Sequence, residues 1–167
     1  MTAFDWGVLA VLALSAVLGI VRGLVRELFA LIGWIVAGAV GVLYATPVGD
    51  AVARVAPELG LGVQARWALG FLLVFLAMLI GAGFIGLTLG KLMRAAGLAM
   101  SDRVLGGVFG LARGLVILVV AVMLAGLTPL PQEPFWAEAR LARPLEALAA
   151  ATKPWLPDAV AARLAFH

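Results

Sequence analysis

Side chains that could perform enzymatic chemistry are scarce in this sequence of 167 residues. It has no cysteine, its one histidine is the final residue, His167, and its only serines are Ser15 and Ser101. A hydrolytic triad needs a nucleophile, a base and an orienting group within mutual reach, and this inventory does not favour one. No acid falls inside the long uncharged segments. We therefore expect no enzyme and no catalytic, cofactor-binding or metal-binding residues.

One pattern of small residues occurs twice. Each copy places small residues four positions apart and ends in Arg-Gly-Leu-Val, with the arginine at Arg22 or Arg113. Small residues at this spacing form a smooth helix face that another helix backbone can approach closely in a membrane. We expect helix packing within the chain or between copies, and the alternative is a duplicated element that lines a site. The packing residues are Ser15, Gly19 and Gly23 in the first copy and Gly106, Gly110 and Gly114 in the second.

Charged residues gather near the two copies of this pattern. We expect them to form a charged rim at one membrane surface, where arginine must meet an acid, a carbonyl or a lipid phosphate. Arg22 and Arg113 are expected to pair with nearby acids or phosphates, and Glu27 and Asp102 are the two acids that could offset Arg113. The rim residues are Arg22, Arg26, Glu27, Asp102, Arg103 and Arg113.

The composition determines the class of protein that positions these residues. The chain is 65% hydrophobic and 13% charged, and its mean hydropathy is +1.15. Soluble domains are about 45–50% apolar and about 25% charged. The core of a soluble protein of 167 residues could not bury this excess of apolar residues. We therefore predict an integral membrane protein and exclude a soluble enzyme, a disordered chain and a disulfide scaffold.

Four uncharged segments are long enough to act as membrane spans, since about 20 helical residues cross the hydrocarbon core. The predicted fold is an all-α integral membrane protein with four transmembrane helices in two helical hairpins, the first joining spans one and two through a very short loop. The first segment is short, and a re-entrant helix is its alternative. The spans are expected at about residues 4–22, 28–47, 67–90 and 107–129, within a membrane domain of residues 1–132.

Residues 133–167 have a different character from the spans. They mix basic and acidic residues with apolar residues at helical spacing, and prolines divide them into short pieces. This pattern is typical of amphipathic helices that lie on a bilayer surface. A solvated, disordered tail is the alternative. We therefore predict short interfacial helices in this C-terminal tail.

Charge predicts both orientation and partners. Lys and Arg in short loops mark the cytoplasmic side, and loops one and three hold most of them, so both termini are expected on the outer, periplasmic side of a bacterial inner membrane. The net charge is +3, but basic residues spread over loops suit anionic lipid rather than nucleic acid. The expected partners are membrane lipid, a second copy through the glycine-rich faces, and an unidentified membrane protein.

The sequence resembles the colicin V production protein (CvpA) family of bacterial inner-membrane proteins, from about residue 4 to residue 127. The resemblance implies four spans, a role in production or export of a peptide toxin, and a part in envelope homeostasis, with no established catalytic activity or ligand. Some members carry an outer protease domain after the last span, in agreement with the predicted orientation. The resemblance depends on Asp5, residues 19–27 (G-x-x-RG-x-x-RE), Gly33-Trp34, residues 101–106 (SDRVLG) and residues 109–114 (FG-x-x-RG).

Two functions fit these observations. The first is an accessory or scaffold protein that acts through helix and lipid contacts. The alternative is a small oligomeric transporter or channel for a lipophilic or peptide substrate. Transport of ions or protons usually places acids or other polar residues inside the spans, and the serine and threonine residues of the spans are only Ser15, Thr46, Thr88 and Thr128. We therefore favour the scaffold.

Overall fold

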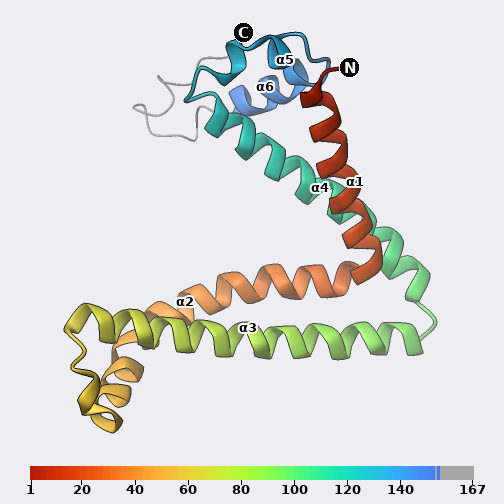
Figure 1. Ribbon diagram of the computed structural model, residues 1–167. Coiled ribbons are helices and arrows are strands. Elements are labelled where there is room, and N and C mark those ends of the chain that lie inside the picture. Colours follow the sequence, from red (N-terminus) through yellow and green to blue (C-terminus); the bar gives the residue numbers. More distant parts are fainter. Residues whose placement is uncertain (153, 155–167) are drawn as a thin grey trace. The chain divides into compact units, whose positions relative to one another are not determined.

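The computed structural model describes residues 1–152 and Pro154, and they form helices joined by short turns (Figure 1). Four helices are long and apolar enough to cross a membrane, by length and composition. This confirms the predicted all-α fold with four transmembrane helices. Residues 153 and 155–167 of the expected tail, His167 included, lie outside the described residues. The four helices are α1 (Ala3–Arg22), α2 (Leu24–Val55), α3 (Val63–Ala95) and α4 (Ala99–Ala125).

Each long helix begins close to its predicted start or earlier. The 20 residues of α1 give a length of about 30 Å at 1.5 Å per residue, enough to cross a hydrocarbon core, which favours a full span over a re-entrant segment. The helix α2 continues through Pro47 to Val55, well past the expected end at residue 47. Figure 1 shows that α2 bends in its C-terminal part, as expected where proline removes a backbone hydrogen bond.

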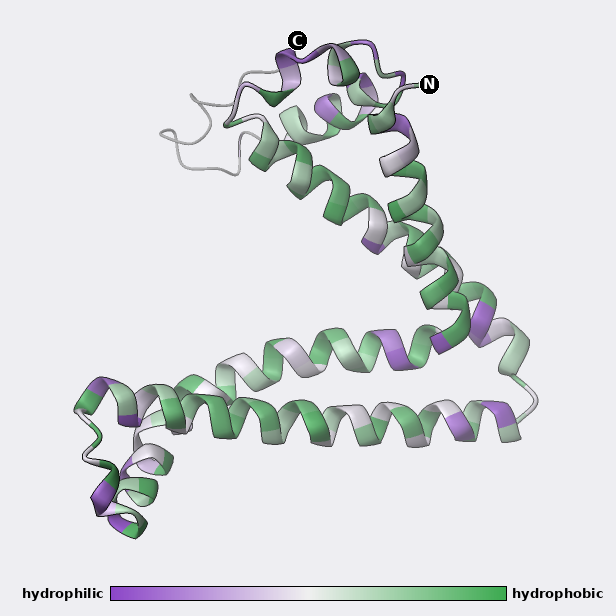
Figure 2. Ribbon diagram, viewed as in Figure 1, coloured by the Kyte–Doolittle hydropathy of each residue, from purple (hydrophilic) through white to green (hydrophobic). Residues whose placement is uncertain are grey.

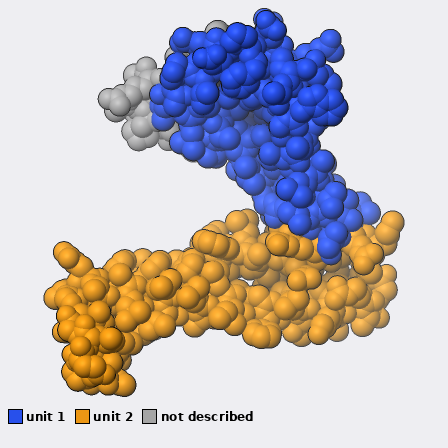
Figure 3. Space-filling model, viewed as in Figure 1, with its two compact units in different colours: residues 1–21, 104–167 blue, residues 22–103 orange. Residues whose placement is uncertain are grey.

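The described chain forms two compact units, coloured separately in Figure 3. One unit holds Arg22–Arg103, and the other holds Met1–Val21 with the chain from Val104 onward. Figure 2 shows that most residues along the helices of both units are hydrophobic (green), with hydrophilic residues (purple) mainly near helix ends and in the C-terminal segment. The expected boundary at residue 132 does not coincide with a boundary between these units.

The Arg22–Arg103 unit is an antiparallel pair of α2 and α3 that run side by side (Figure 1). Their contact is lined by small residues, because only these allow two helix backbones to approach closely. A β-carbon added at Gly70 would lie 2.6 Å from the amide nitrogen of Gly49. The connection between the two helices contains the short 3-10 helix η1 (Pro57–Leu59). The buried small residues are Gly33, Ala37, Gly41, Ala45 and Gly49 of α2 and Gly70, Gly86 and Gly90 of α3.

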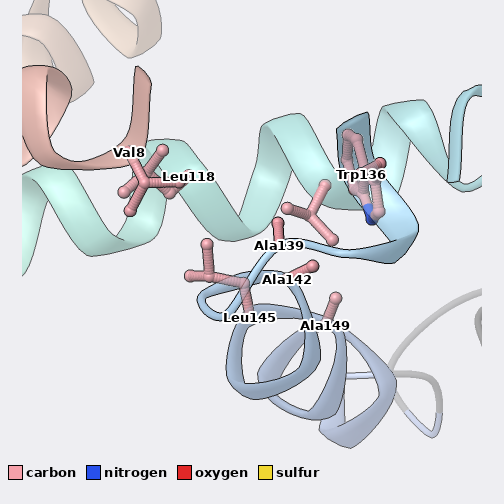
Figure 4. Close-up of a cluster of buried hydrophobic side chains, with 8 residues drawn as sticks. Val8, Leu118, Trp136, Ala139, Ala142, Leu145 and Ala149 are labelled. Atoms are coloured by element: carbon pink, nitrogen blue, oxygen red, sulfur yellow. The ribbon is translucent and has the colours of Figure 1, made fainter. Parts of the chain in front are cut away.

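The other unit packs α1 against α4 and adds the described part of the C-terminal segment. That segment forms η2 (Leu130–Gln132), α5 (Pro134–Ala137) and α6 (Ala142–Ala151). Its apolar residues are buried against the two long helices (Figure 4). The helices η2, α5 and α6 therefore bury apolar side chains against α1 and α4, and their predicted position at the bilayer surface stays a prediction. The cluster consists of Val8, Leu118, Val122, Trp136, Ala139, Ala142, Leu145 and Ala149.

The pairing of the long helices differs from the sequential hairpins that the short first loop predicted. The hairpin in the structure is formed by α2 and α3, and α1 packs against α4 within its own unit. The residue between α1 and α2 is Gly23, whose φ of 83° and ψ of 157° are open to glycine almost alone. This conformation of Gly23 interrupts the helix, so that α1 ends at Arg22 and α2 begins at Leu24.

Candidate interaction site at the helix crossings

The closest approach of α1 and α4 occurs at the two copies of the repeated pattern. A β-carbon added at Gly19 would collide with the carbonyl oxygen of Gly106, and one added at Gly110 would collide with that of Ser15. Gly114 also faces α1, where an added β-carbon would lie 3.0 Å from the Ser15 β-carbon. The two copies therefore pack against each other, one on each helix.

A polar group lies inside this apolar crossing. The hydroxyl of Ser15 donates to the carbonyl oxygen of Gly110 at 2.7 Å, and Ser15 is only 5% exposed. The guanidinium of Arg113 donates to the same hydroxyl through Nε at 3.2 Å and to the Ser15 carbonyl oxygen through Nη2 at 3.4 Å. Ser15 therefore accepts from one α4 side chain while it donates to the α4 backbone. This arrangement attaches the two helices by hydrogen bonds at their point of closest packing.

The carboxylate of Asp102 has a different partner from the one expected. It is 5% exposed and accepts a hydrogen bond from the Val25 amide at 2.9 Å, beside Gly23, where a β-carbon would collide with it. The first amides of a helix have no partner within the helix, so Asp102 serves the first turn of α2. Eleven residues of α4 separate Asp102 from Arg113, about 16 Å along the axis, too far for the expected ion pair.

Glu27, one of the two acids that the sequence offered for Arg113, lies beside Arg22. Nη1 of Arg22 lies 3.5 Å from Oε1 of Glu27, with the arginine side chain 51% exposed and the glutamate 3% exposed. Arg26, in the first turn of α2, lays its aliphatic carbons over the face of α3, 3.2 Å from where a Gly90 β-carbon would be. Arg103 is exposed at the start of α4. Of the six expected rim residues, Arg113 is the one held inside a helix crossing.

Two buried acids, Asp5 and Glu146, were not among the site residues predicted from the sequence. Asp5 has no exposed surface, and its carboxylate accepts hydrogen bonds from the amides of Thr2 at 3.0 Å and Leu141 at 2.9 Å. Glu146 of α6 accepts from the indole Nε1 of Trp136 at 2.7 Å. A single acid at the start of an apolar span was the available signal for Asp5. Nothing in the local sequence connected it with residue 141.

These side chains hold helices and loops together, and the arginines among them place positive charge at one end of the α2–α3 pair. Within residues 1–152 and 154, no cluster of three or more His, Cys, Asp or Glu side chains could hold a metal ion. Ser15 Oγ is bonded to the backbone of α4 and to a guanidinium, which is not a base that could activate a nucleophile. The arrangement suits helix association and the binding of anions.

Known proteins similar to this chain belong to one group. The family described as "Colicin V production protein" matches residues 4–150, and so extends past the last span into the C-terminal segment. The chain is 30% identical over 142 residues to the colicin V production protein of Escherichia coli K12, which covers 84% of this chain and 85% of that one. It is 27% identical over 138 residues to the "Colicin V production protein homolog" of Haemophilus influenzae, covering 82% of each. No solved structure matches the chain.

Proposed function

This chain belongs to the colicin V production protein family, and from that premise we propose that it is a bacterial inner-membrane accessory protein that supports the production or export of colicin V. It acts as a scaffold, through contacts with lipid and with another membrane protein, and has no enzymatic step of its own. The same contacts give it a part in envelope homeostasis. Both termini lie on the periplasmic side.

The observation that carries this proposal is the use made of the buried polar side chains. Ser15 joins α1 to α4, Asp102 serves the first turn of α2, and Asp5 binds the amide of Leu141. Each holds together parts of the chain that are distant in sequence. A transporter for ions or protons would instead direct such groups toward a polar pathway. Polar groups committed to internal packing therefore support a scaffold over a transporter of ions or protons, and the experiment below separates the scaffold from a transporter of a lipophilic or peptide substrate.

The outward faces of the helices supply the contact surface that a scaffold needs. Small residues are buried in the helix pairs, and many large apolar side chains face away from them, among them Ile35 at 67% exposed and Phe84 at 67% exposed. Such faces fit lipid, a second copy of the chain or the helix of a different membrane protein. We propose that one part of this surface binds a membrane protein of the toxin export route.

The test uses a colicin V-producing bacterium that lacks its own family member. Expression of this chain is expected to restore the amount of toxin in the medium. A photo-crosslinking residue placed at Ile35 or Phe84 is then expected to capture one discrete membrane protein when the toxin genes are present. The same probe in cells without the toxin genes is the matched control.

Two results would contradict the proposal. The first is toxin secretion that is the same with and without this chain. The second is restored secretion in which the outward probes capture only lipid, while vesicles containing the purified chain alone accumulate a peptide or lipophilic substrate. That pair of findings would favour the transporter.

A further inference from the structure

A small pocket lies between α2 and α3, close to the beginning of α2. Its volume is about 210 Å³. Arginine side chains border it on one side, and residues with little or no side chain border it on α3, so the space is left open by the absence of bulk. The residues that form it are Arg22, Arg26 and Ala30 on one side and Ala82, Gly83 and Gly86 on the other.

Positive charge is concentrated around this pocket. Arg22 and Arg26 line it, and the guanidinium of Arg94 lies 3.9 Å from the β-carbon position of Gly90, which the Arg26 side chain also overlies. The acid beside these three arginines is Glu27, which pairs with Arg22. The local balance is therefore positive and favours an anion.

The shape and the donors of the pocket suit a phosphate group. A guanidinium presents a planar fork of N–H donors that matches two phosphate oxygens. Arg22 is the last residue of α1 and Arg26 lies in the first turn of α2, and both line the pocket, so two forks can converge on one group. Gly83 and Gly86 allow an anion to approach the α3 backbone.

The surroundings of the pocket favour a lipid as the source of that phosphate. Leu87 also lines the pocket and is 39% exposed, and both helices that form the pocket are candidate membrane spans. A phospholipid whose phosphate lies between the arginines would have its acyl chains against the apolar surface of the helices. Basic pockets between transmembrane helices are known binding sites for anionic lipid head groups.

We propose that this Arg22–Arg26 pocket binds the phosphate head group of an anionic phospholipid. The site deepens the lipid contact in the proposed function and rests on it. The bound lipid lies against the lipid-facing side of the α2–α3 pair, with its phosphate between the two arginines and its acyl chains along Leu87.

The test measures lipid binding to the purified full chain by native mass spectrometry in detergent. Dioleoyl phosphatidylglycerol, which is anionic, is compared with dioleoyl phosphatidylcholine, which has the same chains and no net charge. The parent is expected to bind the anionic lipid more tightly. Hydrogen bonds to charged groups contribute about 1.5–3 kcal/mol and each 1.4 kcal/mol is tenfold, so Arg26→Gln should raise the Kd about tenfold or more.

A second variant fills the pocket without removing charge. Gly83→Leu is expected to raise the Kd to a similar extent, and it should fold because no atom lies within 4 Å of its β-carbon position. Gly81→Leu is its matched control, since that position is equally open and lies about 200° away around α3. Arg54→Gln is the control for Arg26, because Arg54 is an exposed arginine near the other end of α2.

Equal Kd values for the two lipids, or unchanged binding in both Arg26→Gln and Gly83→Leu, would overturn the assignment. Displacement of the anionic lipid by millimolar inorganic phosphate would also overturn it, since the pocket would then be a site for a soluble anion. Binding is measured without toxin, so its failure removes this site and leaves the proposed role in toxin production to the secretion assay. Binding of the anionic lipid by a chain that does not restore secretion would contradict only the proposed role in toxin production.

Discussion

At the scale of single residues, the α1–α4 crossing depends on side chains that are absent and on one hydroxyl that is present. Gly19 and Gly110 leave room for the opposing backbone, and Ser15 uses the resulting proximity to bond to it. The repeated Arg-Gly-Leu-Val pattern has a different use in each copy. Arg113 reaches into the crossing, whereas Arg22 pairs with Glu27 beside the α2–α3 pair.

Substitution of Gly110 tests the close packing. Gly110→Ala is expected to destabilise the α1–α4 pair, because its β-carbon would collide with the Ser15 carbonyl oxygen and force the backbones apart. Gly7→Ala is the matched control, since nothing lies within 4 Å of that position, and alanine there should be neutral or stabilising. Unfolding in mixed micelles measures both variants. Equal stability of the two would contradict the packing.

Removal of the Ser15 hydroxyl tests the polar contact. Ser15→Ala removes the bond to Gly110 and one acceptor of Arg113, and hydrogen bonds between membrane helices contribute about 0.6 kcal/mol on average and up to about 1.7 kcal/mol. We expect a loss of unfolding free energy in this range. Ser101→Ala, at an exposed serine of α4, should change it little. A Ser15→Ala protein as stable as the Ser101→Ala protein would show that the contact does not stabilise the fold.

At the scale of elements, two buried carboxylates connect helix ends with segments far away in the sequence. Asp102 at the start of α4 binds the first turn of α2. Asp5 near the start of α1 binds the backbone immediately before α6. Both therefore determine which segments meet, in addition to satisfying amides that a helix or loop leaves unpaired.

Asp102→Ala is expected to lower the unfolding free energy by about 1–2 kcal/mol, as the loss of a helix-capping acceptor usually does. Asp102→Asn keeps one acceptor oxygen and should lie between the variant and the parent. Asp50→Ala is the control, because Asp50 is an exposed aspartate of α2. The same unfolding measurement applies, and an Asp102→Ala protein that matches the Asp50→Ala protein would argue against a cap.

Asp5→Ala is expected to release the segment that contains α6. Without its acceptor the Leu141 amide has no carboxylate partner, and the adjacent trypsin site between Arg140 and Leu141 becomes more accessible. We expect several-fold faster cleavage there by limited proteolysis. Glu138→Ala, at an exposed acid of the same segment, should leave the cleavage rate unchanged. Identical rates for the two variants would contradict the anchoring role of Asp5.

At the scale of the whole molecule, the distribution of basic residues predicts how the chain is oriented. The first and third connections, counted with the adjoining helix ends, hold Arg22, Arg26, Lys91, Arg94 and Arg103, whereas the helix ends at the middle connection hold Arg54 and Arg66. Short loops rich in Lys and Arg stay in the cytoplasm. The family match over residues 4–150 includes all of these loops.

Reporter fusions test this orientation. Alkaline phosphatase, which is active only outside the cytoplasm, is expected to be active when fused after Gly60 or Thr152 and inactive when fused after Gly97. Green fluorescent protein should give the opposite result at the same three positions. Phosphatase activity after Gly97, or fluorescence after Thr152, would reverse the predicted topology.

The sequence by itself determined the four spans and the faces on which they pack. An uncharged segment of about 20 residues or more is stable as a helix across a membrane, so the number and approximate position of the spans follow from the uncharged runs in the sequence. The Gly106, Gly110 and Gly114 ladder likewise identified a close-contact face, because a helix with no side chains along one stripe gains nothing there except backbone contact.

The tertiary structure alone decided which face meets which. The ladder of α4 met α1, Asp102 bound the Val25 amide rather than Arg113, and the apolar side of residues 133–152 packed on α1 and α4. Periodicity states that one side of a helix is apolar or small, and it is the same whether lipid or protein covers that side. The choice depends on contacts between residues as distant as Asp5 and Leu141, which local sequence does not encode.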